Sequence, residues 1–172
     1  MRFRLYESAT KSLMFRGAGA NLNPGEKYHA GLFFTDNPMD ALNYGDRCQV
    51  YTLIKGAHIY KGESSIECCK DMEVMDYPFP IIKELNNKTN YNVSTLNDVL
   101  DFCILEGEDP NLGLAIFQAV AKEMLVGDGY DGAEWSREDD ITPHQWQIWD
   151  EDVLILKEEL DEEDALEKYD NI

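Results

Sequence analysis

Two aromatic side chains, Phe33 and Tyr44, and one hydroxyl, Thr35, lie close together in the stretch Gly31 to Gly45, GLFFTDNPMDALNYG. If Phe33 lies on a strand and Tyr44 on the helix after it, the two rings can face each other across one cleft. Such a pair can hold a flat ring between its faces, and aromatic pairs also fill ordinary protein cores. A binding cleft for a planar group and a packed core are both compatible with this stretch.

The residues between the two rings predict the elements that would position them. The apolar run up to Thr35 predicts a short strand. Asp36 or Asn37 is a suitable N-cap for a following helix, because its side chain can accept a hydrogen bond from a free backbone N–H. Pro38 suits the first helical turn, where its missing N–H would have had no partner.

This block resembles the strand and helix that hold nicotinamide in ADP-ribosyltransferases, especially the diphtheria-toxin-like and poly(ADP-ribose) polymerase-like branches. In that family a glycine, aromatic residues, Thr-Asp-Asn, an alanine and a tyrosine recur at this spacing. The resemblance implies NAD as substrate, with nicotinamide between Phe33, which Phe34 follows, and Tyr44. It also implies that Thr35 takes the family's hydroxyl position.

The resembled site opens with a strand that ends in an aromatic residue, a basic residue and Gly or Ser. Phe15-Arg16-Gly17 fits this order, and Tyr6-Glu7-Ser8 fits by position but has an acid in place of the base. A carboxylate would repel the phosphates of a dinucleotide, so Arg16 is the better candidate to anchor ribose or phosphate. Arg16 is otherwise a surface arginine beside a turn.

A second motif, Gly129 to Trp135 followed by Gln145 to Leu156, resembles the final pair of strands in many bacterial and phage members of the family. The second of those strands begins with the catalytic glutamate, and that position falls on Gln145. The glutamate orients the ribose and favours the positive charge of the transition state. Glutamine can accept the hydrogen bond but brings no charge, and such a loss can cost roughly a hundredfold in rate.

Three interpretations of Gln145 stay open. An acid from the neighbouring segment, Glu134, Glu138 or one of Asp139 and Asp140, supplies the charge; the register of the motif differs; or the domain binds a dinucleotide with little or no transfer. We favour the first, because the loop Ser136 to His144 holds three acids where the family selects its target. Each of these acids can also be simply solvated.

Composition limits the partners. The chain has 172 residues, about one domain, and a net charge of -19 with a pI near 4.3. Such a charge repels nucleic-acid phosphates and anionic membranes, so direct nucleic-acid binding is not expected and a basic protein is the easier partner. The same charge could instead imitate nucleic acid.

Metal and membrane sites are not expected. The four cysteines include no CxxC pair, and the three histidines have neither HxxxH nor HExxH spacing. A reduced, cytoplasmic chain is the simpler account of these cysteines. No apolar run is long enough for a membrane span, and no signal peptide precedes the first strand.

Periodicity predicts the scaffold. Alternation predicts one or two strands over residues 49–60, and helical spacing predicts packing helices over 94–106 and from Asp109 to near Gly127. One short helix is expected in 62–93. Residues 158–172 carry a run of acids that predicts an exposed helix or a frayed end. The domain is therefore assigned to residues 1–157 and an acidic C-terminal tail to 158–172.

Taken together, the resemblance implies an α+β domain of two packed, mostly antiparallel β-sheets with flanking helices and NAD in the cleft between the sheets. It implies mono-ADP-ribosyl transfer to a macromolecular acceptor, and a basic host protein fits the charge. A phage or mobile-element effector acting in a bacterial cytoplasm fits the small size. Two alternatives remain: an acidic inhibitor that mimics nucleic acid, and a catalytically silent NAD-binding member of the same fold.

Overall fold

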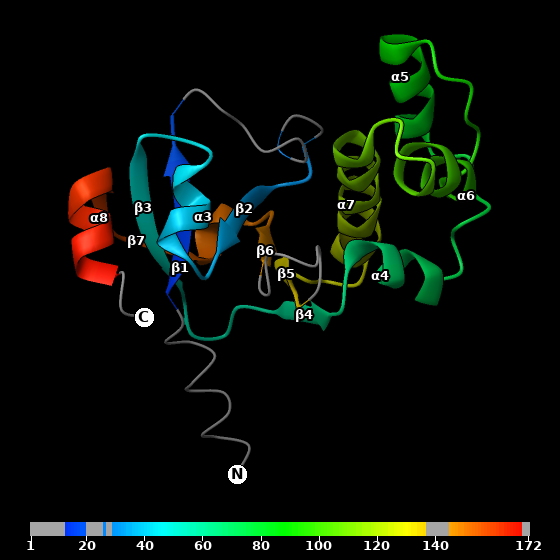
Figure 1. Ribbon diagram of the computed structural model, residues 1–172. Helices are drawn as coiled ribbons and strands as arrows, with labels where there is room; N and C mark the ends of the chain where they lie inside the picture. Colours follow the sequence, from blue (N-terminus) through cyan, green and yellow to red (C-terminus); the bar gives the residue numbers. More distant parts are fainter. Residues whose placement is uncertain (1–12, 20–25, 27–28, 137–144, 170–172) are drawn as a thin grey trace.

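The computed structural model describes residues 13–19, 26, 29–136 and 145–169 (Figure 1). Strands dominate the two ends of this part of the chain, which closes with the helix α8, and most of the other helices lie between them. In chain order the elements are β1 Met14–Ala18, β2 Leu32–Thr35, α3 Pro38–Leu42, β3 Arg47–Leu53, β4 Ile59–Gly62, α4 Ser65–Asp71, α5 Pro80–Thr89, α6 Leu96–Val99, the π-helical η1 Leu100–Leu105, α7 Pro110–Gly127, β5 Gly132–Trp135, β6 Gln145–Ile148, the 3-10 turn η2 Glu151–Val153, β7 Leu154–Asp161 and α8 Glu162–Tyr169.

The described strands join in one seven-stranded sheet with the order β4-β5-β6-β2-β1-β3-β7. Only β4 and β5 pair in parallel; every other pair in the order is antiparallel. The α+β class and the mostly antiparallel pairing predicted from the sequence are confirmed. The continuous strand order differs from the two separate sheets that were expected.

The junction between β1 and β2 is the narrowest in the sheet. These strands pair at a single position, Phe15 with Thr35, whereas β1 pairs with β3 along its whole length from Met14 to Ala18. The sheet therefore consists of two halves, β4-β5-β6-β2 and β1-β3-β7, that meet at one residue pair. The predicted strands over 49–60 are β3 and β4, separated by a turn at Gly56, whose φ of 94° is readily reached by glycine.

Helices cover the two halves of the sheet separately (Figure 1). The helices α4 to α7 bury one core against β5, in which Ala133 and Trp135 are fully buried. On the other half, α3 and α8 share a second core with β1 and β3, made of Phe15, Ala41, Cys48, Val50, Ala165 and Tyr169. A third core contains Met14, Phe34, Trp146, Ile148 and Val153.

The acidic C-terminal stretch is part of the fold. Residues up to Asp161 complete β7, which pairs with β3, and α8 buries Ala165 and Tyr169. The Tyr169 ring packs edge-on against Phe15 at 5.1 Å between centroids. The expected boundary between residues 157 and 158 thus runs through a strand of the sheet, because the apolar residues between the acids pack inward.

Membrane-spanning helices were sought in the described ranges. None of the helices there is both long enough and apolar enough to cross a bilayer.

Candidate functional site

The turn from β2 into α3 forms as its sequence predicts. Asn37 is the N-cap: its side-chain oxygen accepts a hydrogen bond from the Met39 backbone N–H at 2.9 Å, and Pro38 follows in the first turn. The Thr35 hydroxyl accepts a bond from the Asn37 N–H at 3.3 Å. Thr35, only 7 % exposed, is therefore fixed in place, with its hydroxyl hydrogen still available to donate.

The end of α3 lies directly on β1. A Cβ atom at Gly17 would overlap the carbonyl oxygen of Ala41, and one at Gly45 would overlap that of Ala18. Glycine is needed at both positions so that helix and strand can touch backbone to backbone. Tyr44, which follows α3 and is 38 % exposed, is thereby held beside the Gly17 end of β1.

Three predicted site residues share one face of the sheet. Side chains of paired residues point the same way, and side chains alternate along a strand. Because Thr35 pairs with both Phe15 and Gln145, and Phe33 lies two residues before Thr35, these side chains lie on a common face. Phe15 packs against Ala41 of α3, so this is the face that α3 covers.

Beyond the Phe15–Thr35 pair, β1 has an open side. Within the described residues Arg16, Gly17 and Ala18 pair with β3 alone, while Phe33 and Phe34 pair with β6. The two strands therefore leave one another at the Arg16-Gly17 dipeptide that the sequence singled out.

Arg16 is anchored by its neighbours. Its guanidinium donates to Glu26 Oε1 from Nε at 3.2 Å and Nη2 at 2.9 Å, and to Gln49 Oε1 from Nη1 at 3.4 Å. The Tyr51 hydroxyl donates to the same Gln49 oxygen at 3.2 Å. Burial raises the pKa of Tyr51 and the Arg16 charge partly opposes this. Arg16 thus sits at the opening with its charge matched by Glu26.

Three of the predicted residues do not join this group. The Arg16 side chain points to the opposite face from Phe15, where its partner Gln49 lies. Phe34 points to the opposite face, is 2 % exposed and packs edge-on against Tyr51 at 5.2 Å. Glu134 also lies on the opposite face from Gln145, because Gln145 pairs with Trp135, the next residue along β5. The Glu134 carboxylate is 3.9 Å from Lys61 Nζ. Phe34 is therefore a core residue, and Glu134 cannot reach Gln145 from its own position on the strand.

The remaining acids weighed for this site, Glu138, Asp139 and Asp140, fall outside the described residues, as does Glu7.

Sequence reasoning missed the buried Gln147, which organises the neighbourhood of the site. Its amide oxygen accepts from Trp135 Nε1 at 3.0 Å, and its amide nitrogen donates to the carbonyls of Ala30 and Gln118, both at 2.8 Å. These bonds tie the start of β2 to β5 and α7. The two-residue spacing from Gln145 was the available signal, since it predicts a second glutamine on the same strand face.

Cysteine and metal chemistry were also considered. The four cysteines are free thiols and all are buried. Burial, together with the nearby Glu158 charge, raises the pKa of Cys48 to about 11, so its thiol stays protonated at neutral pH. No group of His, Cys, Asp and Glu suited to a metal ion occurs in the described part of the chain.

Comparisons with known proteins give little support for any assignment. Neither the models of known protein families nor the curated proteins match this sequence. A solved structure described as an anti-CRISPR protein is similar over 79 % of this chain and 88 % of its own, with 14 % identity and a TM-score of 0.35. A likeness this weak carries no argument about fold or function.

Proposed function

We propose that the chain is an NAD-dependent mono-ADP-ribosyltransferase that modifies a macromolecular acceptor, specifically a protein. The observation that supports this most is the grouping around the Phe15–Thr35 pair. Arg16 and Gly17 follow Phe15 on β1, Gln145 pairs with Thr35, and the end of α3 brings Tyr44 onto β1. Motifs that are far apart in the sequence thus lie on neighbouring strands and on the helix beside them, as the resemblance implies.

The opening between β1 and β2 is the proposed NAD cleft. The two halves of the sheet meet at one residue pair, and the face with Phe34 and Tyr51 forms a separate core. We propose that the halves act as the two packed sheets of the resembled fold. Nicotinamide would lie between Phe33 and Tyr44, with the Gly17 backbone beside it and Thr35 close to the ribose.

In this reaction the bond from ribose C1′ to the nicotinamide nitrogen breaks, and the nitrogen keeps the electron pair. The acceptor then bonds to C1′ and gives up its proton. Gln145 can accept a hydrogen bond from the ribose. The Arg16 side chain lies on the opposite face of the sheet, so in this proposal it meets the pyrophosphate at the open edge of β1, once Glu26 yields part of its contact. Glu134 faces away from Gln145, so our candidate for the carboxylate that favours the positive C1′ is Glu138.

A catalytically silent NAD-binding domain is the second candidate, and the uncharged Gln145 is the observation that favours it. The net charge of -19 favours a third, an acidic inhibitor that mimics nucleic acid. That inhibitor would bind its partner with a steep dependence on salt and would not need Tyr44. A bacterial cytoplasm reached from a phage or mobile element remains the proposed setting.

The test is to incubate the purified chain with NAD labelled on its adenosine half and a bacterial lysate. We expect label on a discrete protein band, and its loss with Tyr44→Ala. Thermal unfolding with and without NAD is measured on the same samples. A rise in Tm with NAD but no label would support the silent domain. If NAD neither raises Tm nor labels a protein, the proposed NAD cleft is overturned.

A further inference from the structure

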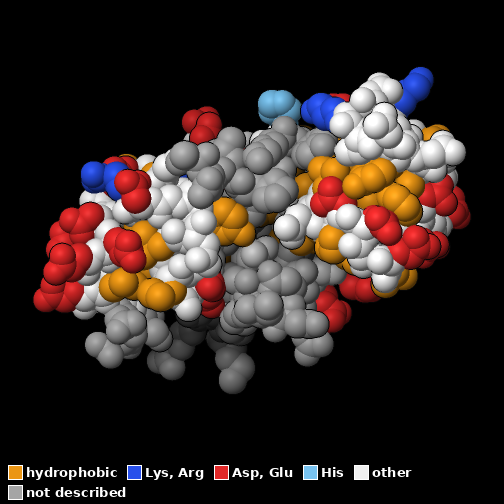
Figure 2. Space-filling view, turned by 45° about the horizontal axis from the view of Figure 1, so that its top comes forward, with side chains coloured by type: hydrophobic (Ala, Val, Ile, Leu, Met, Phe, Trp, Pro, Cys, Tyr) orange, Lys and Arg blue, Asp and Glu red, His pale blue; other side chains and the backbone are white. Residues whose placement is uncertain are grey.

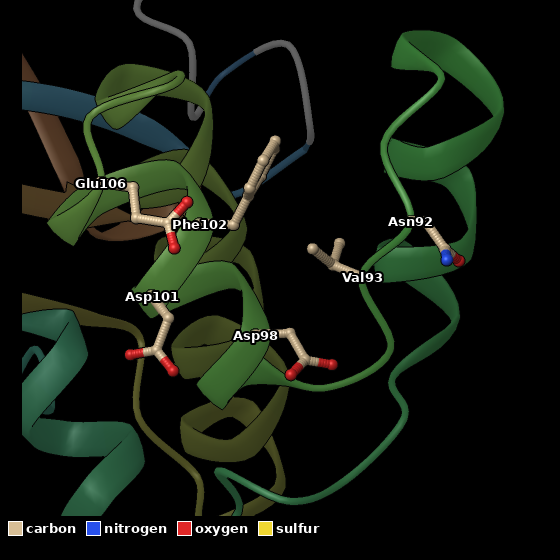
Figure 3. A pocket seen from close by; sticks show the side chains of 6 residues that line it. All are labelled: Asn92, Val93, Asp98, Asp101, Phe102 and Glu106. Carbon is tan, nitrogen blue, oxygen red and sulfur yellow. The ribbon is translucent and has the colours of Figure 1, made fainter.

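A hollow of about 350 Å³ lies on the helical side of the molecule, away from β1 and β2. Phe102 of η1 and Val93, in the segment after α5, lie on opposite sides of it, and Val93 points toward η1 (Figure 3). The lining residues are Asn92, Val93, Asp98, Asp101, Phe102 and Glu106. Nothing in the proposed NAD chemistry uses this hollow.

Its walls are fixed by contacts within the chain. The Asn86 side chain donates to the Val93 carbonyl at 2.6 Å and accepts from the Val93 N–H at 3.1 Å. The Tyr91 ring packs edge-on against Phe102 at 5.0 Å. Asp98 accepts from the Thr95 N–H at 3.1 Å as part of a capping box. A binding surface held in this way loses little conformational freedom when it is occupied.

The charge around the hollow has one sign. Asp101 and Glu106 are exposed, and no Lys or Arg among the described residues pairs with either. Residues 89–121 contain five acids and neither Lys nor Arg. An anionic ligand is repelled by such a surface, and a cationic group is attracted.

Apolar side chains accompany these charges. Leu105 is 70 % exposed and adjoins Glu106, and Phe102 reaches the hollow from the same π-helical segment. Figure 2 shows hydrophobic side chains bordered by acidic ones on the lobe built by the helices. π-Helical segments are uncommon and frequently occur at functional sites.

We propose that this hollow is a docking site for a protein segment that carries Lys or Arg beside an apolar side chain. The apolar side chain packs between Phe102 and Val93, and the cation lies against Asp101 and Glu106. The carboxylates are already exposed and do not lose a partner on binding. This inference goes beyond the proposed function and does not depend on it, since docking requires neither NAD nor Gln145.

The test uses the full chain and fluorescently labelled peptides of alternating Lys and Leu, with Lys-Ser and Glu-Leu peptides for comparison. Binding is measured by fluorescence anisotropy at low and high salt. We expect the Lys-Leu peptide to bind most tightly. The double variant Asp101→Asn, Glu106→Gln should weaken its binding roughly three- to tenfold, because two partly exposed charge contacts are lost.

The matched control is Glu162→Gln, Glu163→Gln, which removes the same charge from exposed positions on α8, at the other end of the molecule (Figure 1). It should leave binding within about twofold of the original. Hydrogen exchange on the complex should show protection over residues 92–106. Equal weakening by both double variants, equal binding of the Lys-Leu and Glu-Leu peptides, or no protection at 92–106 would overturn the docking site.

Discussion

Gln145 is the residue on which the proposed chemistry depends most. It pairs with Thr35, on the face that α3 covers. A carboxylate at that position would stabilise the positive charge that develops on the ribose in the transition state. An amide of nearly the same shape can hold the ribose but cannot supply this stabilisation. A substitution that adds a charge at residue 145 and changes little else therefore tests whether this residue lies at the catalytic position.

We predict that Gln145→Glu increases ADP-ribosyl transfer, or NAD hydrolysis if no acceptor is present, by roughly tenfold or more. The estimate follows from the roughly hundredfold effect of single preorganised transition-state contacts. Release of nicotinamide from NAD measures both reactions. Asn87→Asp, which adds a carboxylate at an exposed position on α5, serves as the control and should not raise the rate. A fall in rate with Gln145→Glu would show that the register assumed here is wrong.

For single residues, the sequence predicted which element each one lies on better than it predicted which residues each one contacts. It predicted a strand that ends at Arg16, whereas β1 continues to Ala18 and Arg16 is its middle residue, and it gave no sign that Glu26 would pair with Arg16. Glu134 was proposed to reach Gln145, yet strand alternation puts it on the opposite face. That outcome depends on the register of Trp135 with Gln145, which is set by how β5 pairs with β6 and cannot be read from local sequence.

The elements themselves were largely predictable, and their exceptions have physical reasons. Apolar spacing predicted a single helix over 94–106, but α6 continues as η1, in which the Glu106 N–H bonds to the Asp101 carbonyl at 2.8 Å. The close approach of α7 accompanies this change, since a Cβ at Gly113 would lie 2.7 Å from the Cβ of Cys103. Where one short helix was expected in 62–93, the structure has both α4 and α5.

The tie between β2, β5 and α7 gives a prediction at this scale. Gln147→Leu should lower the free energy of unfolding by about 2 to 4 kcal/mol, because Trp135 Nε1–H and two carbonyls are left buried without their partner. Urea unfolding followed by circular dichroism measures the loss. Glu84→Gln, which breaks only an exposed ion pair with Lys88, is the control and should change stability by less than about 1 kcal/mol. A loss no larger than the control's would contradict the role assigned to Gln147.

The contact between β7 and α8 gives a prediction in pH. Hydrogen bonds from Lys168 and Tyr169 hold the pKa of Glu158 below its usual value, and the bond to Glu158 raises that of Lys168. A carboxylate with a lowered pKa stabilises the fold above its unfolded pKa, near 4.3, and loses that contribution as pH falls through the folded value. Because the pKa of Lys168 is raised, its ammonium group stabilises the fold at every pH below its unfolded pKa. That stabilisation is lost as pH rises through the folded pKa.

Glu158→Gln should therefore lower Tm at about pH 7, and its Tm should approach that of the original chain below about pH 4. Thermal unfolding of both proteins over this range measures the effect. Glu163→Gln, an exposed change on α8, should show a smaller difference at neutral pH. A difference between Glu158→Gln and the original chain that persists unchanged into acid would contradict this account.

On the scale of the whole molecule, charge separates the two regions that we propose to be functional. The opening beside β1 contains Arg16, whereas the charged side chains that line the hollow between α5 and η1 are all acidic (Figures 1 and 3). A basic protein would be drawn to the acidic lobe, whereas Arg16 offers its charge to an anionic dinucleotide only when its contact with Glu26 is broken. The sequence showed the net charge but not this division, because the fold determines which surface each acid occupies.

The excess of 34 acidic over 15 basic side chains must also act against the compact state. Folding brings like charges closer together, and added salt screens exposed repulsions over about 10 Å at 0.1 M. Most of the described ion pairs are exposed as well, so salt weakens them too, but the net charge of -19 means that repulsion between acids is the larger contribution. Screening should therefore stabilise this protein.

We predict that Tm rises by roughly 2 to 4 °C between low salt and about 0.3 M NaCl, the shift that about 1 kcal/mol gives a domain of this size. Differential scanning calorimetry at pH 7 measures it. Choline chloride in place of NaCl distinguishes general screening from specific binding of Na⁺, because only screening is common to both salts. A Tm that falls with both salts would mean that attractive pairs outweigh repulsion, and the acidic surface would then be stabilised by contacts within the chain instead of being left open to a basic partner.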